Sequence, residues 1–435
     1  MKKLVRLFYK KILPKFIKKR IILTRWHVNQ YNRKTNELVS GLTYSQYPIK
    51  VLFIISTLPM WRGQGLYNLL AKDERFDPRI LIVPFKRVGI EEGKMVSKEI
   101  ANDLSRISIK ANNLYDQDFN IENFLKDFNP NIVFPCQPYD GMYGNQIDDI
   151  GKNRIVCYIP YGLNTVFEEF AYNTKNHNYF WKVYQASFLH FKTAKRLMVN
   201  NAKNVVIVGE PDYDKFIQED RLDPWKKFSD EKTRKRIIWA PHFSINPNNL
   251  LHRASFLWLY EEMLKIAKEY KDKIQIAFKP HPNLHSVLVN LTEWGEERTN
   301  EYYNKWSSME NTQLEEGNFI DLFKYSDAMI HDSGSFTGEY MFVNKPVMFT
   351  TKDIKSIRNR ADDFGLKCLD LHYIGEDIED IREFIENVVL GEKDTMKDMR
   401  AAFYNDYLIP PNGNTVAQNI YNDLLSSFGY EPLSE

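Results

Sequence analysis

The sequence predicts an α/β protein built from two doubly wound, Rossmann-like halves. Short apolar runs alternate with helix-like stretches from residue 49 onward, and a charged segment interrupts this alternation once before it starts again. Continuous apolar strands separated by helices are typical of parallel sheets that are covered on both faces. The length of 435 residues and the hydrophobic content of 43% fit two or three domains with sizeable cores.

The first half is expected at residues 49–218. Its strands are predicted where short apolar runs rich in β-branched residues occur, at 49–56, 79–84, 131–136, 154–159 and 204–209. Helices are expected between these strands, for example over 121–128 and 178–197. This pattern predicts one Rossmann-like domain.

A linker is predicted at 219–235, which is crowded with charge and contains Pro224. The second Rossmann-like domain is expected at 236–410, followed by a C-terminal helix within 411–435. The predicted strands are 236–240, 274–279, 327–331 and 346–350, and the predicted helices are 255–270, 377–389 and 415–428. Ligands of open α/β sheets bind at the carboxyl ends of the strands, so we expect the functional site in a cleft between the two halves.

Residues 1–48 are predicted to be a separate, basic N-terminal segment. The first 36 residues contain twelve lysines and arginines and no acidic residue. Because the whole chain has a formal net charge of only +2, the remainder of the chain is acidic. Four apolar residues spaced by four would share one side of a helix, which Pro14 would kink or end. They are Leu4, Phe8, Ile12 and Phe16.

This basic amphipathic pattern predicts contact between residues 1–36 and an anionic membrane surface. A disordered solubilising tail and a nucleic-acid arm are the alternatives, but nucleic acid is not the expected partner because only the tail is basic. No apolar stretch is long enough to span a bilayer, and no signal-peptide core with a cleavage site is present. We therefore expect a cytoplasmic protein that is peripheral on the inner face of the cell membrane.

The three cysteines, Cys136, Cys157 and Cys368, are scattered along the chain. Two of them lie in apolar runs, which predicts buried free thiols in a reducing compartment. No HExxH motif, EF-hand loop or Cys/His cluster is present, so neither a metal nor another cofactor is predicted.

The polar turn after the strand at 327–331 is a candidate phosphate site. It consists of Asp332, Ser333, Gly334 and Ser335. A short helix is predicted over 336–343, and its N-terminal amides and partial positive charge would attract phosphate, while Glu339 could accept ribose hydroxyls. The alternative is an ordinary serine-capped helix whose Glu339 faces water.

Two histidines follow other strands of the second half. His281 lies between two prolines directly after the strand that ends at Lys279, so its backbone range is narrow, and its imidazole could donate to a phosphoryl oxygen or act as an acid or base. His242 follows the strand end at Trp239-Ala240-Pro241 and is expected to face the same cleft. For each, the alternative is a loop histidine without a catalytic role.

Two turns of the first half could face the site from the other side. Tyr161-Gly162 follows the strand at 154–159, although a tyrosine phenol is a weak base near neutral pH. Gly209 ends the last strand of this half and can adopt a turn conformation. The alternatives are that Tyr161 only packs at a turn and that Gly209 belongs to an ordinary loop between a strand and a helix.

Three motifs, in this order and spacing, resemble those of the CDP-glycerol glycerophosphotransferases, enzymes of teichoic acid and related capsule synthesis. They are WAPHFS (239–244), KPHPNL (279–284) and HDSGSFTGEYMFVNKPVMF (331–349). Gly209-Glu210-Pro211-Asp212 is similar to a Gly-x-Pro-x-x-Asp segment of this family, with Asp214 as the candidate for the last acid. The resemblance covers residues 235–350 well and the first half only in pattern.

The resemblance implies a GT-B fold with an acceptor domain first, a nucleotide-donor domain second, and monotopic membrane association. His281 is similar to the family's donor-phosphate histidine, and Ser333, Gly334 and Ser335 correspond to its pyrophosphate-binding serine turn. Together with the residues singled out above by their chemistry and position, this gives the predicted donor-binding set of Lys279, His281, Asp332, Ser333, Gly334, Ser335, Glu339 and Gly209. The family's turn reads Ser-Ser where this chain has Ser-Gly-Ser.

A second departure concerns the base. The family has a His-Gly pair in the first half whose histidine serves as the acceptor's base, and the equivalent here is Tyr161-Gly162, which leaves Tyr161 and His242 as candidate bases. The implied reaction is attack of a hydroxyl, on a cell-surface glycan or lipid-linked acceptor, at the β-phosphorus of a CDP-linked polyol phosphate such as glycerol phosphate, with CMP as the leaving group.

Other functions stay open at this stage. A GT-B glycosyltransferase of capsule or lipopolysaccharide synthesis would use the same cleft with a nucleotide-sugar donor. The Asp-Ser-Gly turn also resembles that of the non-hydrolysing UDP-N-acetylglucosamine 2-epimerases, which share the GT-B fold. A non-catalytic binding protein is the remaining alternative, because the family's base is replaced.

Overall fold

A computed structural model of the chain describes residues 25–42, 48–85, 89–139, 154–166, 169–219, 221–228, 230, 232–245, 254–317 and 319–431. Residues 1–24, which carry most of the predicted membrane-contacting segment, lie outside the described part. Among the described residues, none of the helices combines the length and the apolar character that crossing a bilayer requires.

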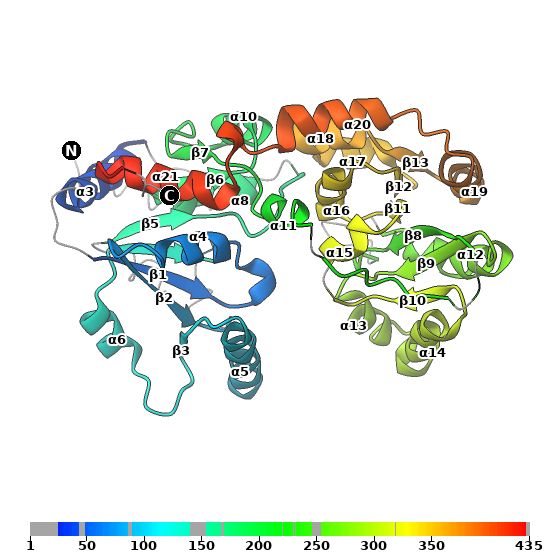
Figure 1. Cartoon of the computed structure of the whole chain (residues 1–435), viewed down its shortest axis with the longest axis horizontal. Coiled ribbons are helices and arrows are strands. Elements are labelled where there is room, and N and C mark those ends of the chain that lie inside the picture. The colour runs from blue at the N-terminus through cyan, green and yellow to red at the C-terminus, as the bar shows by residue number, and fades with distance from the viewer. Residues whose placement is uncertain are drawn as a thin grey trace, which may run out of the picture. The chain divides into compact units, whose positions relative to one another are not determined.

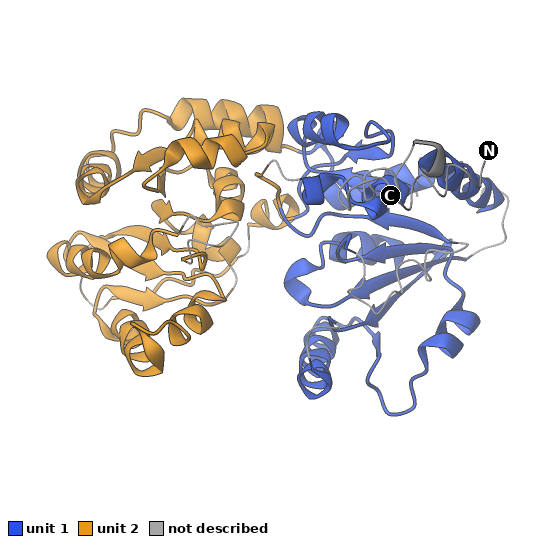
Figure 2. Ribbon diagram, turned by 180° about the vertical axis from the view of Figure 1, so that it is seen from behind, with its two compact units in different colours: residues 1–162, 168–211, 410–435 blue, residues 163–167, 212–409 orange. Residues whose placement is uncertain are grey.

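The chain divides into two compact units, which Figure 2 distinguishes by colour. Unit 1 comprises residues 1–162, 168–211 and 410–435, and unit 2 comprises residues 163–167 and 212–409. Each unit contains one parallel sheet with helices along it (Figure 1). The predicted α/β class with two Rossmann-like sheets is confirmed.

Unit 1 has a seven-stranded parallel sheet in the order β3-β2-β1-β4-β5-β6-β7. Its strands are β1 (Ile49–Ile55), β2 (Phe76–Ile82), β3 (Ala111–Asn113), β4 (Ile132–Pro135), β5 (Ile155–Tyr158), β6 (Lys182–Gln185) and β7 (Val205–Ile207). Its α-helices are α3 (Arg25–Leu42), α4 (Gln64–Leu70), α5 (Ile90–Arg106), α6 (Ile121–Phe128), α8 (Glu169–Tyr172), α9 (Lys175–Tyr179), α10 (Phe188–Leu197) and α21 (Val416–Phe428), with 3₁₀ turns at Leu58–Met60 and Pro411–Gly413. The strand β1 is buried on both faces, as its unbroken apolar run predicts.

The expected helix over 178–197 is wrong. The segment contains the end of α9, the strand β6 and the helix α10. β6 pairs with β5 on one side and β7 on the other, and its Val183 and Tyr184 are buried. A short buried run has no periodicity that separates strand from helix, so the neighbouring strands decide its conformation.

The C-terminal helix α21 is part of unit 1 and packs beside α4 (Figure 1). The Tyr421 hydroxyl donates to Asp73 Oδ2 at 2.7 Å, and Lys182 Nζ donates to Asp423 Oδ2 at 2.6 Å. Gly209, with φ +101°, lets the chain approach this C-terminal segment, because a Cβ there would lie 2.9 Å from Pro410 Cβ. The end of the chain thereby helps to fix the edge of the first sheet.

Unit 2 has a six-stranded parallel sheet in the order β10-β9-β8-β11-β12-β13. Its strands are β8 (Lys235–Ala240), β9 (Ile274–Phe278), β10 (Thr312–Leu314), β11 (Ala328–His331), β12 (Val347–Thr350) and β13 (Tyr373–Gly375). Its helices are α11 (Tyr213–Phe216), α12 (Phe256–Glu269), α13 (Leu284–Val289), α14 (Gly295–Ser308), α15 (Phe319–Lys324), α16 (Gly334–Glu339), α17 (Ile354–Arg360), α18 (Asp363–Leu369), α19 (Ile378–Glu383) and α20 (Lys397–Phe403). A 3₁₀ turn (Tyr340–Val343) follows α16, and π-helical turns (Phe384–Leu390 and Tyr404–Leu408) follow α19 and α20.

An aromatic core holds the strands of unit 2 that carry the candidate site. Trp239 of β8 is fully buried and stacks on Phe278 of β9, with ring centroids 5.0 Å apart. Phe256 of α12 and Trp306 of α14 pack on the same indole at 6.0 and 5.3 Å. Aromatic pairs of this kind contribute beyond their buried area, so the ends of β8 and β9 are held on a rigid base.

The charged segment expected to be a linker is tied to unit 2 in its described part. Trp225 is buried and its Nε1 donates to Leu322 O at 3.2 Å. Arg221 forms an ion pair with Asp321, and Arg236 forms another with Asp223 at 3.0 Å. The charges of this segment therefore find partners within the second unit.

Candidate functional site

The loops that carry His281, His242 and the serine turn meet at one edge of the second sheet. They follow the carboxyl ends of β8, β9 and β11. The strand order reverses between β8 and β11, and such a switch point is where open α/β sheets bind their ligands. The sheet topology therefore gathers residues that are up to 90 positions apart in the sequence.

Asp332 fastens two of these loops together. Its Oδ1 accepts the His242 amide at 2.6 Å, and its Oδ2 accepts the Ser255 hydroxyl at 2.7 Å and the Ser255 amide. The side chain is fully buried. A carboxylate that accepts several N–H and O–H groups is a strong, charge-assisted anchor. Asp332 thus joins the ends of β8 and β11 to the start of α12.

His281 lies beside the β8 loop. Its amide donates to Pro241 O at 3.0 Å, and its ring centroid is 4.8 Å from that of His242 and 4.5 Å from that of Phe243. Asn283 N donates to His281 Nδ1 at 3.1 Å, so the neutral ring carries its proton on Nε2. Burial lowers the pKa of His281 to about 4, which keeps the ring neutral near pH 7. His281 is therefore arranged to donate from Nε2.

His242 has the same tautomer by the same argument. Ser244 N donates to His242 Nδ1 at 3.3 Å, and the Ser244 hydroxyl lies 2.8 Å from this nitrogen. With Nδ1 accepting, the ring proton of neutral His242 is on Nε2. This arrangement suits a hydrogen-bond donor better than a base.

The serine turn leaves several backbone amides without an acceptor. Ser333 is the N-cap of α16, but its side chain makes no capping hydrogen bond, and its Oγ lies 3.4 Å from Ser335 Oγ. In the described part of the chain, the amides of Gly334, Ser335 and Phe336 bond to no acceptor. The Thr165 hydroxyl donates to Gly334 O at 2.8 Å and holds the turn from behind. Unbonded amides flanked by hydroxyls form a suitable anion-binding turn.

Two buried histidines fix the peptide that leads into this turn. Ser333 N donates to His331 Nδ1 at 3.1 Å, and His331 Nε2 lies 3.2 Å from His372 Nε2. His372 Nδ1 lies 2.7 Å from Cys368 O, which can only accept, so His372 Nδ1 carries the proton and donates. His372 Nε2 then accepts from His331 Nε2, and His331 Nδ1 accepts from the Ser333 amide. Burial lowers the pKa of both rings, that of His372 to about 4, so both are neutral. We call His331 and His372 the histidine pair.

Two other predicted donor-binding residues are buried within unit 2. Lys279 donates from Nζ to Gly317 O at 2.7 Å, and burial lowers its pKa. Its ammonium thus holds the chain that follows β10. Glu339 ends α16 and is also buried. Donor contacts of these two side chains stay predictions.

The remaining predicted residues, Tyr161 and Gly209, belong to unit 1. Tyr161 follows β5; its carbonyl accepts Arg62 Nε at 2.9 Å, and its hydroxyl lies 3.3 Å from that of Tyr139. Gly209 follows β7 and packs against the C-terminal segment, as described above. The role of Tyr161 as a base and that of Gly209 in donor binding stay predictions.

Several residues that shape the site had no role in the sequence interpretation. Ser255 anchors Asp332, Phe243 packs on His281, and Thr165 holds the serine turn. Ser255 was visible only as the first residue of a predicted helix. Thr165 lies 169 positions before Gly334, so the sequence offers no signal that would connect them.

The described residues contain no group of three or more His, Cys, Asp or Glu side chains that could hold a metal ion. The three cysteines are buried free thiols. The arrangement at this edge of the sheet offers neutral N–H donors, backbone amides and hydroxyls, which suit a phosphate-bearing ligand.

Solved structures confirm the GT-B-like fold. A variant of the wall teichoic acid polymerase TagF is 12% identical, has a TM-score of 0.56, and is matched over 92% of this chain and 94% of its own. The UDP-GlcNAc 2-epimerase from Neisseria meningitidis, bound to UDP-GlcNAc, is 16% identical with a TM-score of 0.53, over 87% of this chain and 100% of its own. At these identities the likeness shows the fold alone.

Sequence comparison gives the family. A curated relative, the teichoic acid poly(ribitol-phosphate) polymerase of Bacillus spizizenii, is 23% identical over 257 residues, which are 55% of this chain and 36% of the relative, so the chain spans well under half of that protein. The model of the family described as CDP-glycerol:poly(glycerophosphate) glycerophosphotransferase matches residues 150–426, which is more than half of the chain. The chain belongs to this family of transferases.

Proposed function

We propose that this protein transfers a polyol phosphate, such as glycerol phosphate or ribitol phosphate, from a CDP-linked donor to a hydroxyl of a cell-surface glycan or lipid-linked acceptor. The family match supports the class of reaction. The observation that carries the proposal is the meeting of His281, His242 and the serine turn through Asp332 at the switch point of the second sheet. Phosphoryl transfer chiefly needs positioned donors around the transferring group, and this edge provides them.

In the proposed mechanism the donor's diphosphate lies against the amides of Gly334 and Ser335. The acceptor oxygen forms a bond to the β-phosphorus while the bond from this phosphorus to the bridging oxygen breaks, and CMP leaves with that electron pair. His281 donates from Nε2 to a phosphoryl oxygen and stabilises the charge that develops there.

The acceptor's proton passes to a base or to water. Tyr161 is our candidate, because Tyr161-Gly162 resembles the family's His-Gly pair in the sequence. His242 is the weaker candidate, since its Nε2 carries the ring proton when Nδ1 accepts from Ser244. A weak base is tolerable, because a loose transition state places little demand on the nucleophile.

Membrane contact through residues 1–36 belongs to the same proposal. Twelve lysines and arginines without an acid would hold the enzyme on an anionic inner membrane surface, where lipid-linked acceptors are found. The fold match to an epimerase bound to UDP-GlcNAc favours one second candidate, an enzyme that acts on a UDP-sugar.

Incubation of the protein with CDP-glycerol, CDP-ribitol or UDP-GlcNAc, each with and without a hydroxyl-bearing acceptor, tests the proposal. We expect acceptor-dependent release of CMP from a CDP-linked donor. Release of UDP would instead indicate a glycosyltransferase, and conversion of UDP-GlcNAc without an acceptor would indicate an epimerase. Binding of the nucleotides without any turnover would favour a non-catalytic protein. Nucleotide binding is followed in parallel by the rise in thermal stability.

A further inference from the structure

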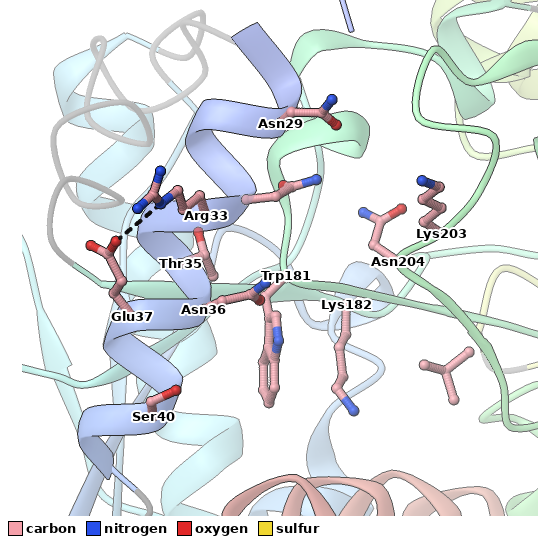
Figure 3. Close-up of a pocket in the computed structure, with 12 residues that line it drawn as sticks. Asn29, Arg33, Thr35, Asn36, Glu37, Ser40, Trp181, Lys182, Lys203 and Asn204 are labelled. Carbon is pink, nitrogen blue, oxygen red and sulfur yellow. Dashed lines mark ion pairs between the residues drawn. The ribbon is translucent and has the colours of Figure 1, made fainter. Parts of the chain in front are cut away.

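A groove of about 900 Å³, lined mostly by polar residues, lies in unit 1 between α3 and the strands β6 and β7 (Figure 3). None of the residues predicted for the donor site or for catalysis lines it. Trp181 and Asn204, which do line it, precede β6 and β7 and so lie at the amino ends of these strands. Tyr161 follows the carboxyl end of the parallel strand β5. The groove is therefore at the opposite end of the first sheet from the candidate base.

One wall of the groove is a stripe of neutral polar side chains on α3. Its members are Asn29, Asn32, Asn36 and Ser40, three or four positions apart and hence on one side of the helix. Figure 3 shows Asn29, Asn36 and Ser40 along this side. The other side of α3 is fixed to the unit, because Val28 and Leu42 are buried and Tyr31 stacks on Tyr179 with ring centroids 4.5 Å apart. An amide both donates and accepts, as a hydroxyl group does, so this wall suits a ligand that carries several hydroxyls.

The opposite wall is built from side chains that are already held in place. Asn204 donates from Nδ2 to His177 O at 2.8 Å and to Phe180 O at 2.7 Å. Lys182 donates from Nζ to Asp423 Oδ2 at 2.6 Å and lies over the half-buried Trp181 ring, 4.7 Å from its centroid. A site whose side chains are held before binding loses less conformational entropy when it binds a ligand.

The charge of the groove favours an anion. Arg33 and Glu37 form an exposed ion pair at 3.5 Å, and Figure 3 shows both pointing away from Lys203. Lys182 is paired with Asp423. Lys203 is exposed and forms no ion pair or hydrogen bond with any described residue. It therefore contributes a positive charge, opposite the amide wall, that no carboxylate of the described residues pairs with.

We propose that this groove binds a polyol phosphate, with its phosphate at Lys203 and its hydroxyls on the amide stripe of α3. The inference rests on the proposed function for the identity of the ligand. Because the groove and Tyr161 lie at opposite ends of the first sheet, the polyol phosphate bound in the groove is a remote part of the acceptor and does not carry the hydroxyl that reacts. Its source is either the growing polymer or the headgroup of an anionic lipid, which share this chemistry.

Calorimetric titration of the full chain with a soluble glycerol phosphate oligomer tests the site. We expect Lys203→Glu to weaken binding about tenfold, the effect of losing one charge-assisted contact. The matched control is Lys98→Glu, which changes another exposed lysine, on α5 next to the other edge of the sheet, and we expect it to leave binding unchanged. Equal affinities of the two variants for the oligomer and in the vesicle arm below would overturn the proposal.

A second arm distinguishes the sources of the ligand. Sedimentation with phosphatidylglycerol and phosphatidylcholine vesicles measures lipid binding of the same variants. Loss of oligomer binding in Lys203→Glu assigns the groove to the polymer, whereas loss confined to phosphatidylglycerol vesicles assigns it to the headgroup. The CMP-release assay is run in parallel. Lys203-dependent binding without CMP release would refute only the proposed function, and CMP release with binding that ignores Lys203 would refute only this inference.

Discussion

The histidine pair allows a test that separates its hydrogen bond to the serine turn from its packing in the core. His331→Leu removes the acceptor for the Ser333 amide but nearly conserves the volume of the buried ring. His331→Asn leaves a cavity beside His372. The asparagine Oδ1 is three bonds from Cα, as the imidazole Nδ1 is, so this oxygen can still accept from the Ser333 amide. The two variants thus separate the hydrogen bond from the packing.

The magnitude follows from the burial of this turn. Leaving the buried Ser333 amide without its 3.1 Å bond to His331 costs about 1–3 kcal/mol. A turn that moves to recover this bond no longer presents Gly334 and Ser335 to a diphosphate. Because 1.4 kcal/mol corresponds to a tenfold change in affinity, we expect His331→Leu to bind a CDP-linked donor about 5- to 100-fold more weakly. We expect His331→Asn to stay within about threefold of the wild type, although the cavity that it leaves also lowers its stability.

Titration with CDP-glycerol gives the affinities, and denaturant unfolding gives the stabilities of the same preparations. Circular dichroism confirms that both variants are folded. A weaker donor affinity of His331→Asn than of His331→Leu would refute the reasoning, because the histidine pair would then act only as part of the core. Equal losses of affinity in the two variants would refute it as well.

Three further predictions concern the same unit. Gly365→Ala places a Cβ 2.1 Å from Thr165 O, so we expect displaced Thr165 to release the serine turn and donor affinity to fall by about tenfold or more, as measured by calorimetry. His281→Phe removes the Nε2 donor, and we expect kcat for CMP release to fall about 100-fold while His281→Gln, with an amide N–H near the same place, retains more activity. The unfolding free energy should decrease as the pH falls from about 6.5 towards 4, because His331 and His372 remain neutral when folded but take up protons when unfolded, at up to about 1.4 kcal/mol per pH unit and histidine. His331→Leu should show a shallower decrease in the same urea titrations.

The sequence predicts four of the six strands of unit 2, because each of these four is a short apolar run followed at once by a polar turn. It misses β10 and β13, which have three residues each and no such run. The same rule locates the serine turn, His281 and His242 at strand ends, and parallel pairing brings strand ends to one edge. The rule cannot show that β6 interrupts the expected helix over 178–197, because the buried run Val183-Tyr184 becomes a strand only when β5 and β7 lie beside it. Short elements depend on their neighbours more than on their own residues.

The partners of a predicted site residue are harder to predict than its place. Asp332 lies in the predicted turn, and its charge suggests contact with a ligand, but its oxygens accept from His242 and Ser255, which only the folded sheet brings near. The Lys279 ammonium likewise donates to Gly317 O, a group of the protein itself. In both cases burial decides, since a charged group inside a protein must be paired with groups of the protein itself.

This distinction bears on how the family's chemistry can persist when its residues change. The groups that we expect to touch the donor are backbone amides, two hydroxyls and one imidazole N–H, and none of them needs to be charged. What holds them in place is a buried scaffold of Asp332, the histidine pair and Thr165. A turn that reads Ser-Gly-Ser in place of Ser-Ser can present the same amides provided that this scaffold keeps its direction. The scaffold residues, and not the serines alone, are therefore the positions at which substitution should most strongly separate donor binding from folding.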